Sequence, residues 1–179
     1  WFTGTWDQIV EILRVIVLIP HAPAVWDAMH ALAEVSTGDR DAALAALERA
    51  AQRWGDSDRT MSFWMTIFCG FHASLLLESE HHLDWYSQRV LSRADDTCHV
   101  GQTAFLGFPS YYLGLLARRN GDIEEAIRHQ QDATDSVLRF GLWPWGAVSA
   151  VELLEMGATL PKEFDDLDHL YDIGDISLN

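Results

Sequence analysis

Apolar residues recur every three or four positions along most of the chain, which is the periodicity of an amphipathic α-helix. Prolines and glycines break this pattern at intervals, at places where helices begin or end. The pattern predicts a series of helices joined by short links, as in an antiparallel helical array. They cover residues 5–18, 24–35, 40–54, 61–77, 83–93, 102–119 (with a bend or a new start at Pro109), 123–140 and 144–156. No Asn-Gly or Asp-Gly turn joins two alternating strands, so no β-hairpin is indicated.

Two segments of the chain align when the Gly-Asp turn at residues 38–39 is placed on the one at residues 121–122. Small residues then coincide seven positions before the turn glycine (Ala31 and Gly114), five after it (Ala43 and Ala126) and twelve after it (Ala50 and Ala133). Small side chains at these positions let neighbouring helices approach closely. The spacing is typical of tetratricopeptide-like hairpins. Over residues 1–159 the sequence therefore predicts an all-α, tetratricopeptide-like helical-hairpin array (an α-α superhelix), with an unrelated helical bundle as the alternative.

The last twenty residues, 160–179, form a separate acidic segment. Phe164, Leu167 and Leu170 recur there at three-residue spacing, and Pro161 suits the start of a short helix. The pattern predicts a short amphipathic helix over residues 162–171. We expect it to cap the array, because the last repeat of a solenoid otherwise leaves an apolar face uncovered.

Composition excludes several classes of function. The 179 residues include 27 Asp and Glu against 12 Lys and Arg, a formal net charge of −15, which disfavours direct binding to nucleic acid. Two cysteines make no disulfide framework, so a reducing cytoplasm is expected. The most apolar run, residues 9–19, is too short to span a bilayer. The abrupt start at Trp1 leads us to expect a piece of a longer chain.

Catalytic and nucleotide-binding motifs are weak or missing in the sequence. His81, His82 and Asp84 are ligand-type residues in a predicted link, but they lack the helical spacing of zinc motifs. Asp96, Cys98 and His99 form a similar loop group, whose acidic setting disfavours a reactive thiolate. No glycine-rich phosphate loop occurs, and Lys162 is the sole lysine. We therefore expect no catalytic centre and no cofactor in this chain.

Aromatic residues supply the candidate binding site. They recur at helical spacing on the predicted helices 61–77 and 102–119, which would line the concave face of an array. Most such side chains form packed core. The functional interpretation is a groove for a partner or ligand, lined by Trp64, Phe68, His72, Phe105, Phe108, Tyr112, Trp143 and Trp145.

Three stretches of the chain together resemble a known family. They are residues 110–117 (Ser-Tyr-Tyr-Leu-Gly-Leu-Leu-Ala), 120–126 (Asn-Gly-Asp-Ile-Glu-Glu-Ala) and 140–145 (Phe-Gly-Leu-Trp-Pro-Trp). They are similar to the C-terminal tetratricopeptide-like region of large bacterial ATPase-type signalling regulators. The resemblance implies a parent chain with an NTPase module and either a LuxR-type DNA-binding domain or a class III adenylate/guanylate cyclase. The segment 160–179 departs from the family pattern.

We therefore expect a non-catalytic interaction or sensor domain of a cytoplasmic bacterial signalling or transcriptional regulator. It would bind a protein or peptide partner, or a small-molecule effector, and bias a neighbouring ATPase or output module. It would contact neither nucleic acid nor membrane. Two alternatives stay open: a plain oligomerisation scaffold that forms a homo-oligomer, and a metal-dependent helical enzyme domain that uses His81, His82 and Asp84.

Overall fold

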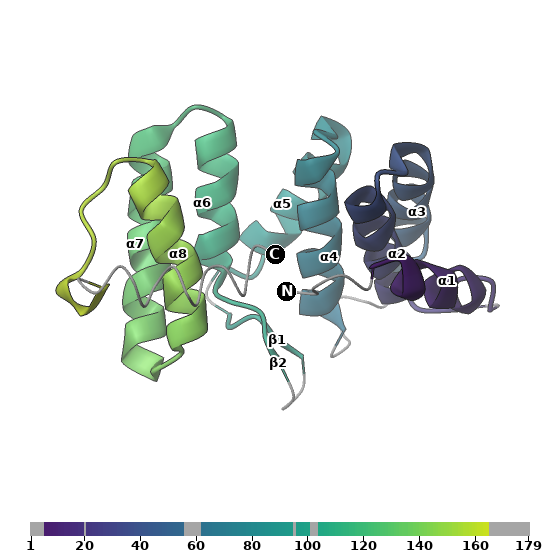
Figure 1. The fold of residues 1–179 in the computed structure, drawn as a ribbon, viewed down its shortest axis with the longest axis horizontal. Helices are drawn as coiled ribbons and strands as arrows, with labels where there is room; N and C mark the ends of the chain where they lie inside the picture. Colours follow the sequence, from purple (N-terminus) through teal and green to yellow (C-terminus); the bar gives the residue numbers. More distant parts are fainter. Residues whose placement is uncertain (1–5, 20, 56–61, 95, 101–103, 165–179) are drawn as a thin grey trace. The chain divides into compact units, whose positions relative to one another are not determined.

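The helical periodicity of the sequence is realised as a helical array in the computed structural model (Figure 1). The structure describes residues 6–19, 21–55, 62–94, 96–100 and 104–164, with backbone only at residues 99, 100, 104, 105, 143, 144 and 163. These residues group into two compact units, which we describe separately. The first unit comprises residues up to Arg89 together with 99–106, and the second comprises residues 90–98 and those from Gly107 onward.

The first unit is built from five helices and a small hairpin. Its helices are α1 (Trp6–Ile16), α2 (Ala24–Thr37), α3 (Arg40–Gln52), α4 (Phe63–Leu76) and α5 (Glu80–Leu91), the last of which extends into the second unit. Helix α2 packs against α1, α3 and α4, so it is the central element of this unit. Its buried face carries several alanines, of which Ala24, Ala28, Ala31 and Ala33 are fully buried. These small side chains allow the neighbouring helices to pack closely.

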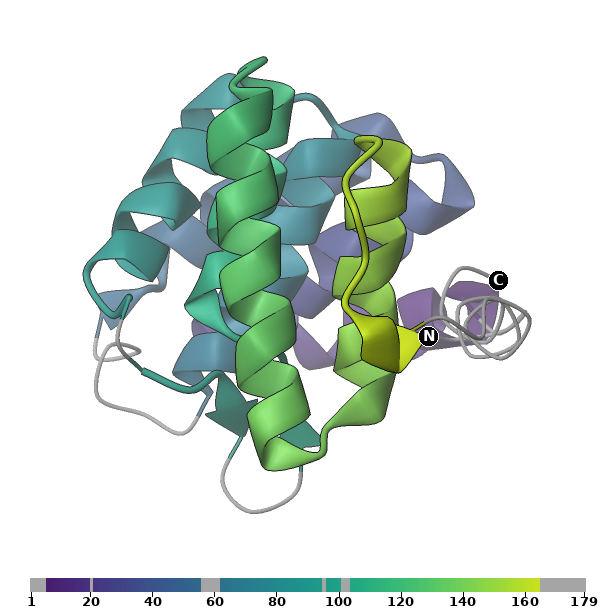
Figure 2. The same ribbon diagram turned by 90° about the vertical axis from the view of Figure 1, so that its left-hand side faces the viewer.

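The second unit is built around a helical hairpin and one further helix. It contains α6 (Pro109–Arg119), α7 (Ile123–Phe140), α8 (Trp143–Glu155) and a 3-10 turn, η2 (Lys162–Phe164). Helices α6, α7 and α8 lie side by side (Figures 1 and 2). A Cβ atom at Gly114 of α6 would lie 2.6 Å from Nε2 of Gln130 on α7, and Ala126 is fully buried. The prediction that Gly114 and Ala126 are helix–helix contact positions is confirmed.

The turns between α2 and α3 and between α6 and α7 share one geometry. Gly38 and Gly121 have φ angles of 94° and 81°, a left-handed conformation that glycine adopts without steric cost. The aspartate after each glycine caps the next helix, with Asp39 accepting from the Ala42 N–H and Asp122 from the Glu125 N–H. Between α4 and α5 the same left-handed position is held by Glu78, at φ 54°. The turn between α4 and α5 therefore has this left-handed position without a glycine.

Two predicted elements differ from the structure. The predicted helix over residues 102–119 begins only at Pro109, because Gly107 is left-handed (φ 94°) and Phe108 is extended, as expected for a residue before proline. Upstream lies a two-stranded antiparallel hairpin that the sequence did not indicate, β1 (His99–Val100) and β2 (Ala104–Phe105). Phe105 and Phe108 therefore do not share a helix with Tyr112. In addition, α5 begins at Glu80, so most of the predicted link 78–82 is helical.

The predicted capping helix is described only at its start. Phe164 is buried in η2 and packs against Ala147 and Ala150 of α8, as predicted for the first residue of the apolar stripe. Residues 165–171, which carry the rest of that prediction, lie outside the described residues. The boundary between residues 159 and 160 therefore stays a prediction.

Candidate functional site

The predicted aromatic residues of the first unit contribute mainly to helix packing. Trp64 on α4 is buried and meets Phe63 edge to face, with ring centroids 4.9 Å apart. One turn on, Phe68 and His72 are half-buried, and their rings lie 4.6 Å apart. His72 Nδ1 donates to the Phe68 carbonyl at 2.8 Å, and burial lowers the pKa of this histidine. The side chain of Phe105 lies outside the described part of the structure.

In the second unit the candidate aromatic side chains are buried. Tyr112 is fully buried, and Phe108 and Trp145 are each 8% exposed. Trp145 packs edge to face on Tyr111 at 5.8 Å, and Phe108 stacks on Phe140 at 6.0 Å. The side chain of Trp143 is not among those described. These contacts explain the packing of α6 to α8, and a groove over these side chains stays a prediction.

The two histidines of the candidate metal site, His81 and His82, lie in different environments. His81 and Asp84 are exposed on α5, whereas His82 is buried and its Nδ1 lies 2.8 Å from the Ser79 hydroxyl. In the described residues, no three His, Cys, Asp or Glu side chains are arranged to hold a metal ion. Burial raises the pKa of both cysteine thiols, that of Cys69 to about 12.

A buried polar network on α2 is the main feature that sequence reasoning missed. Asp27 is fully buried, and its two carboxylate oxygens accept hydrogen bonds from Arg49 of α3 and from Arg53 directly after it, both at 2.9 Å. Arg53 also donates to the carbonyl of Val17, directly after α1, at 3.1 Å. The two guanidinium groups compensate the buried carboxylate, which would otherwise be very costly to remove from water.

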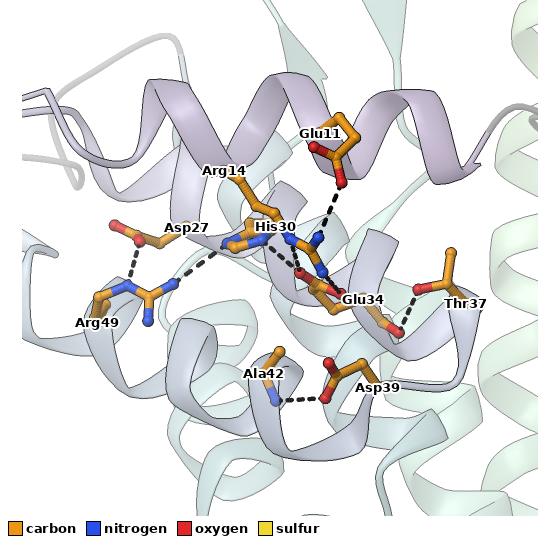
Figure 3. Close-up of polar contacts among 9 residues, drawn as sticks. All are labelled: Glu11, Arg14, Asp27, His30, Glu34, Thr37, Asp39, Ala42 and Arg49. Carbon is orange, nitrogen blue, oxygen red and sulfur yellow. Dashed lines mark hydrogen bonds and ion pairs between the residues drawn. The ribbon is translucent and has the colours of Figure 1, made fainter.

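The network continues one and two turns further along α2 (Figure 3). His30 Nδ1 lies 3.3 Å from Nη2 of Arg49, and its Nε2 lies 2.9 Å from the Glu34 carboxylate. Because the arginine can only donate, both contacts fit a neutral imidazole with its proton on Nε2. Arg14 of α1 reaches Glu34 through Nε at 3.1 Å and Nη2 at 3.4 Å, and also binds Glu11 at 2.9 Å. These contacts raise the pKa of Arg14.

The polar network therefore fixes α1 at two points. Arg14, in the last turn of α1, binds Glu34, and Arg53 holds the backbone of Val17 directly after the helix. The sequence contains a signal for the network that was overlooked. Asp27, His30 and Glu34 are spaced by three and four residues, so they share one stripe of a helix whose buried face is otherwise alanine. Polar residues on such a face need partners, and Arg49 and Arg53 are one helical turn apart.

Helix α1 carries an exposed apolar surface on its outer side. Among the described residues, four exposed large hydrophobic side chains belong to α1 or the turns directly after it, and we call them the apolar ridge: Ile12 (60% exposed), Val15 (67%), Leu18 (79%) and Ile19 (54%). The opposite side of α1, with Val10 and Leu13, packs against α2. Other exposed large hydrophobic side chains are scattered over α3, α4, α5 and α7. The ridge is thus a local concentration of exposed apolar surface, which is typical of interaction sites.

Comparisons with known proteins return no counterpart: no family model, no curated protein and no solved structure matches the chain. In the part of the chain that the structure describes, no helix has both the length and the apolarity needed to cross a membrane.

Proposed function

We propose that this chain is a non-catalytic interaction domain of a cytoplasmic bacterial signalling or transcriptional regulator. In this proposal, a tetratricopeptide-like array binds a protein partner through the apolar ridge of α1 and biases a neighbouring ATPase or output module. The observation that carries the proposal is the ridge itself. The ridge exposes four large aliphatic side chains by more than half on one short segment. Contact of these side chains with water costs free energy, and binding of a partner that covers them recovers that free energy.

The polar network supports the same function because it holds α1 in place before a partner arrives. A surface that is already ordered loses little conformational entropy on binding, so more of the interaction energy appears as affinity. Two contacts hold α1 in place: the paired hydrogen bonds from Arg14 to Glu34, and the hydrogen bond from Arg53 to the Val17 carbonyl. Both contacts run to residues of α2 or the segment after α3, and the ridge side chains stay exposed.

Site-directed photo-crosslinking in bacterial cells that make the protein tests this proposal. A photoreactive residue at Val15 should yield a defined adduct with a partner polypeptide, and the substitution Ile12→Glu should abolish that adduct. The matched control is a photoreactive residue at Leu44, an exposed leucine on α3 that should give no such adduct. Equal adducts from Val15 and Leu44, or an adduct that survives Ile12→Glu, would contradict the proposal. Circular dichroism should report unchanged helicity in each variant.

A plain oligomerisation scaffold is the second candidate, since the same ridge would be covered if two copies paired through α1. Sedimentation velocity distinguishes the two functions. A scaffold predicts a dimer that dissociates on Val15→Glu but not on Leu44→Glu. The partner-binding function predicts that the wild-type chain sediments as a monomer over the micromolar range.

A further inference from the structure

The charges around the apolar ridge indicate which charge its partner should carry. Asp7 and Glu11 are exposed on α1, and Arg14 is the helix's single basic residue. Arg14 already binds two carboxylates, those of Glu34 and Glu11. The rim of the ridge therefore presents excess negative charge, in keeping with the net charge of −15 for the whole chain.

The spacing of the ridge side chains indicates the shape of the occupant. Ile12 and Val15 occupy positions i and i+3 of α1 and form an exposed stripe, and Leu18 and Ile19 follow it in the turns directly after the helix. A second helix that lies along α1 covers such a stripe with its own apolar stripe. Four side chains are also far fewer than the roughly 20–30 residues a side of a standard protein interface. A single helix is therefore a better match than a large folded surface.

We infer that the apolar ridge binds a basic amphipathic helix of a partner protein, with its apolar stripe on Ile12 and Val15 and its Lys or Arg side chains near Asp7 and Glu11. This inference rests on the proposed function, because it names the partner of the same surface. A second copy of the chain fits less well, since it carries the same negative rim and the same net charge of −15. An anionic membrane surface is disfavoured for the same reason.

Synthetic peptides test the inference by isothermal titration. The probe is a helix-forming peptide of about 18 residues, long enough to reach measurable helicity, with leucines at i, i+3, i+4 and i+7 and lysines flanking them. Two control peptides replace the lysines by glutamates or scramble the order of the lysine peptide. We expect the lysine peptide to bind at least about tenfold more tightly than either control, with an affinity that falls as salt is added.

Protein variants locate the binding site of the peptide. Val15→Gln should weaken binding of the lysine peptide by about tenfold through lost apolar contact, whereas Leu44→Gln should not change it. Glu11→Lys should weaken binding further than Asp135→Lys, an equal change in charge on an exposed position of α7. Equal loss in the two lysine variants would mean that only the net charge matters, and this would overturn the inference.

Other outcomes overturn it in distinguishable ways. If the glutamate peptide binds as tightly as the lysine peptide and Val15→Gln weakens both, the partner is not basic although the ridge still binds a helix. If no peptide binds while Val15 crosslinks to a polypeptide in cells, the proposed function stands and the helix chemistry is wrong. If ridge variants instead reduce binding to anionic phospholipid vesicles, or dissociate a dimer, the occupant is a membrane or a second copy.

Discussion

Asp27 shows how single residues in this array depend on charges from another helix. Its side chain is fully buried, and the two arginines that neutralise it are about one third exposed. Removing the carboxylate leaves two guanidinium groups close together without their acceptor. A buried ion pair broken in this way is strongly destabilising, even where the intact pair adds little net stability.

We predict that Asp27→Ala lowers the free energy of unfolding by about 2–4 kcal/mol, somewhat less than a fully buried pair because water reaches the arginines. Asp132→Ala on α7 is the control, since Asp132 pairs with Arg128 where both side chains are more than half exposed. That change should stay within about 0.5 kcal/mol. Urea denaturation measures both variants, and similar losses would contradict the role given to the network.

His82 provides a pH-dependent prediction at the same scale. Burial lowers its pKa from the ordinary value of 6.5, so the unfolded chain binds a proton at this residue more readily than the folded chain does. Stability must therefore fall as the pH drops below about 6.5, and the loss stops once the pH passes the folded pKa. His82→Gln should reduce the difference between the unfolding free energies at about pH 7.5 and pH 5.5, because these two pH values lie on either side of the ordinary histidine pKa of 6.5. Parallel pH profiles for the two proteins would refute this.

The hairpin of α6 and α7 illustrates packing at the scale of elements. Gly114 faces Gln130, whose Nε2 donates to the Tyr111 carbonyl at 3.1 Å. A larger side chain at position 114 would displace this amide and push the helices apart. We predict that Gly114→Leu lowers the free energy of unfolding by about 1–3 kcal/mol, the usual cost of overpacking. Arg119→Leu, at an exposed position of the same helix, should leave the denaturation midpoint nearly unchanged.

Helix boundaries were predictable where a local signal determines them. Pro109 was predicted as a bend or a new start, and α6 does start there. The conformation of the residues before Pro109 could not be predicted from local signals alone. The short hairpin β1–β2 is held by cross-strand pairs and by the Cys98 N–H to Gly107 carbonyl hydrogen bond, and β1 contacts α4. Such contacts leave little trace in hydrophobic periodicity.

At the scale of the whole molecule, the sequence by itself determined the helical architecture and the positions of its hairpin turns. These features depend on local physics: the 3.6-residue period, left-handed glycines at 38 and 121, and the small residues that follow at fixed spacing. The tertiary structure alone decided which polar side chains are buried and which apolar ones are exposed. Asp27 and Val15 have the reverse of their usual environments, because the helices packed around Asp27 supply its arginine partners whereas the outer face of α1 is left uncovered. Burial is a nonlocal property, and residue type predicts it only on average.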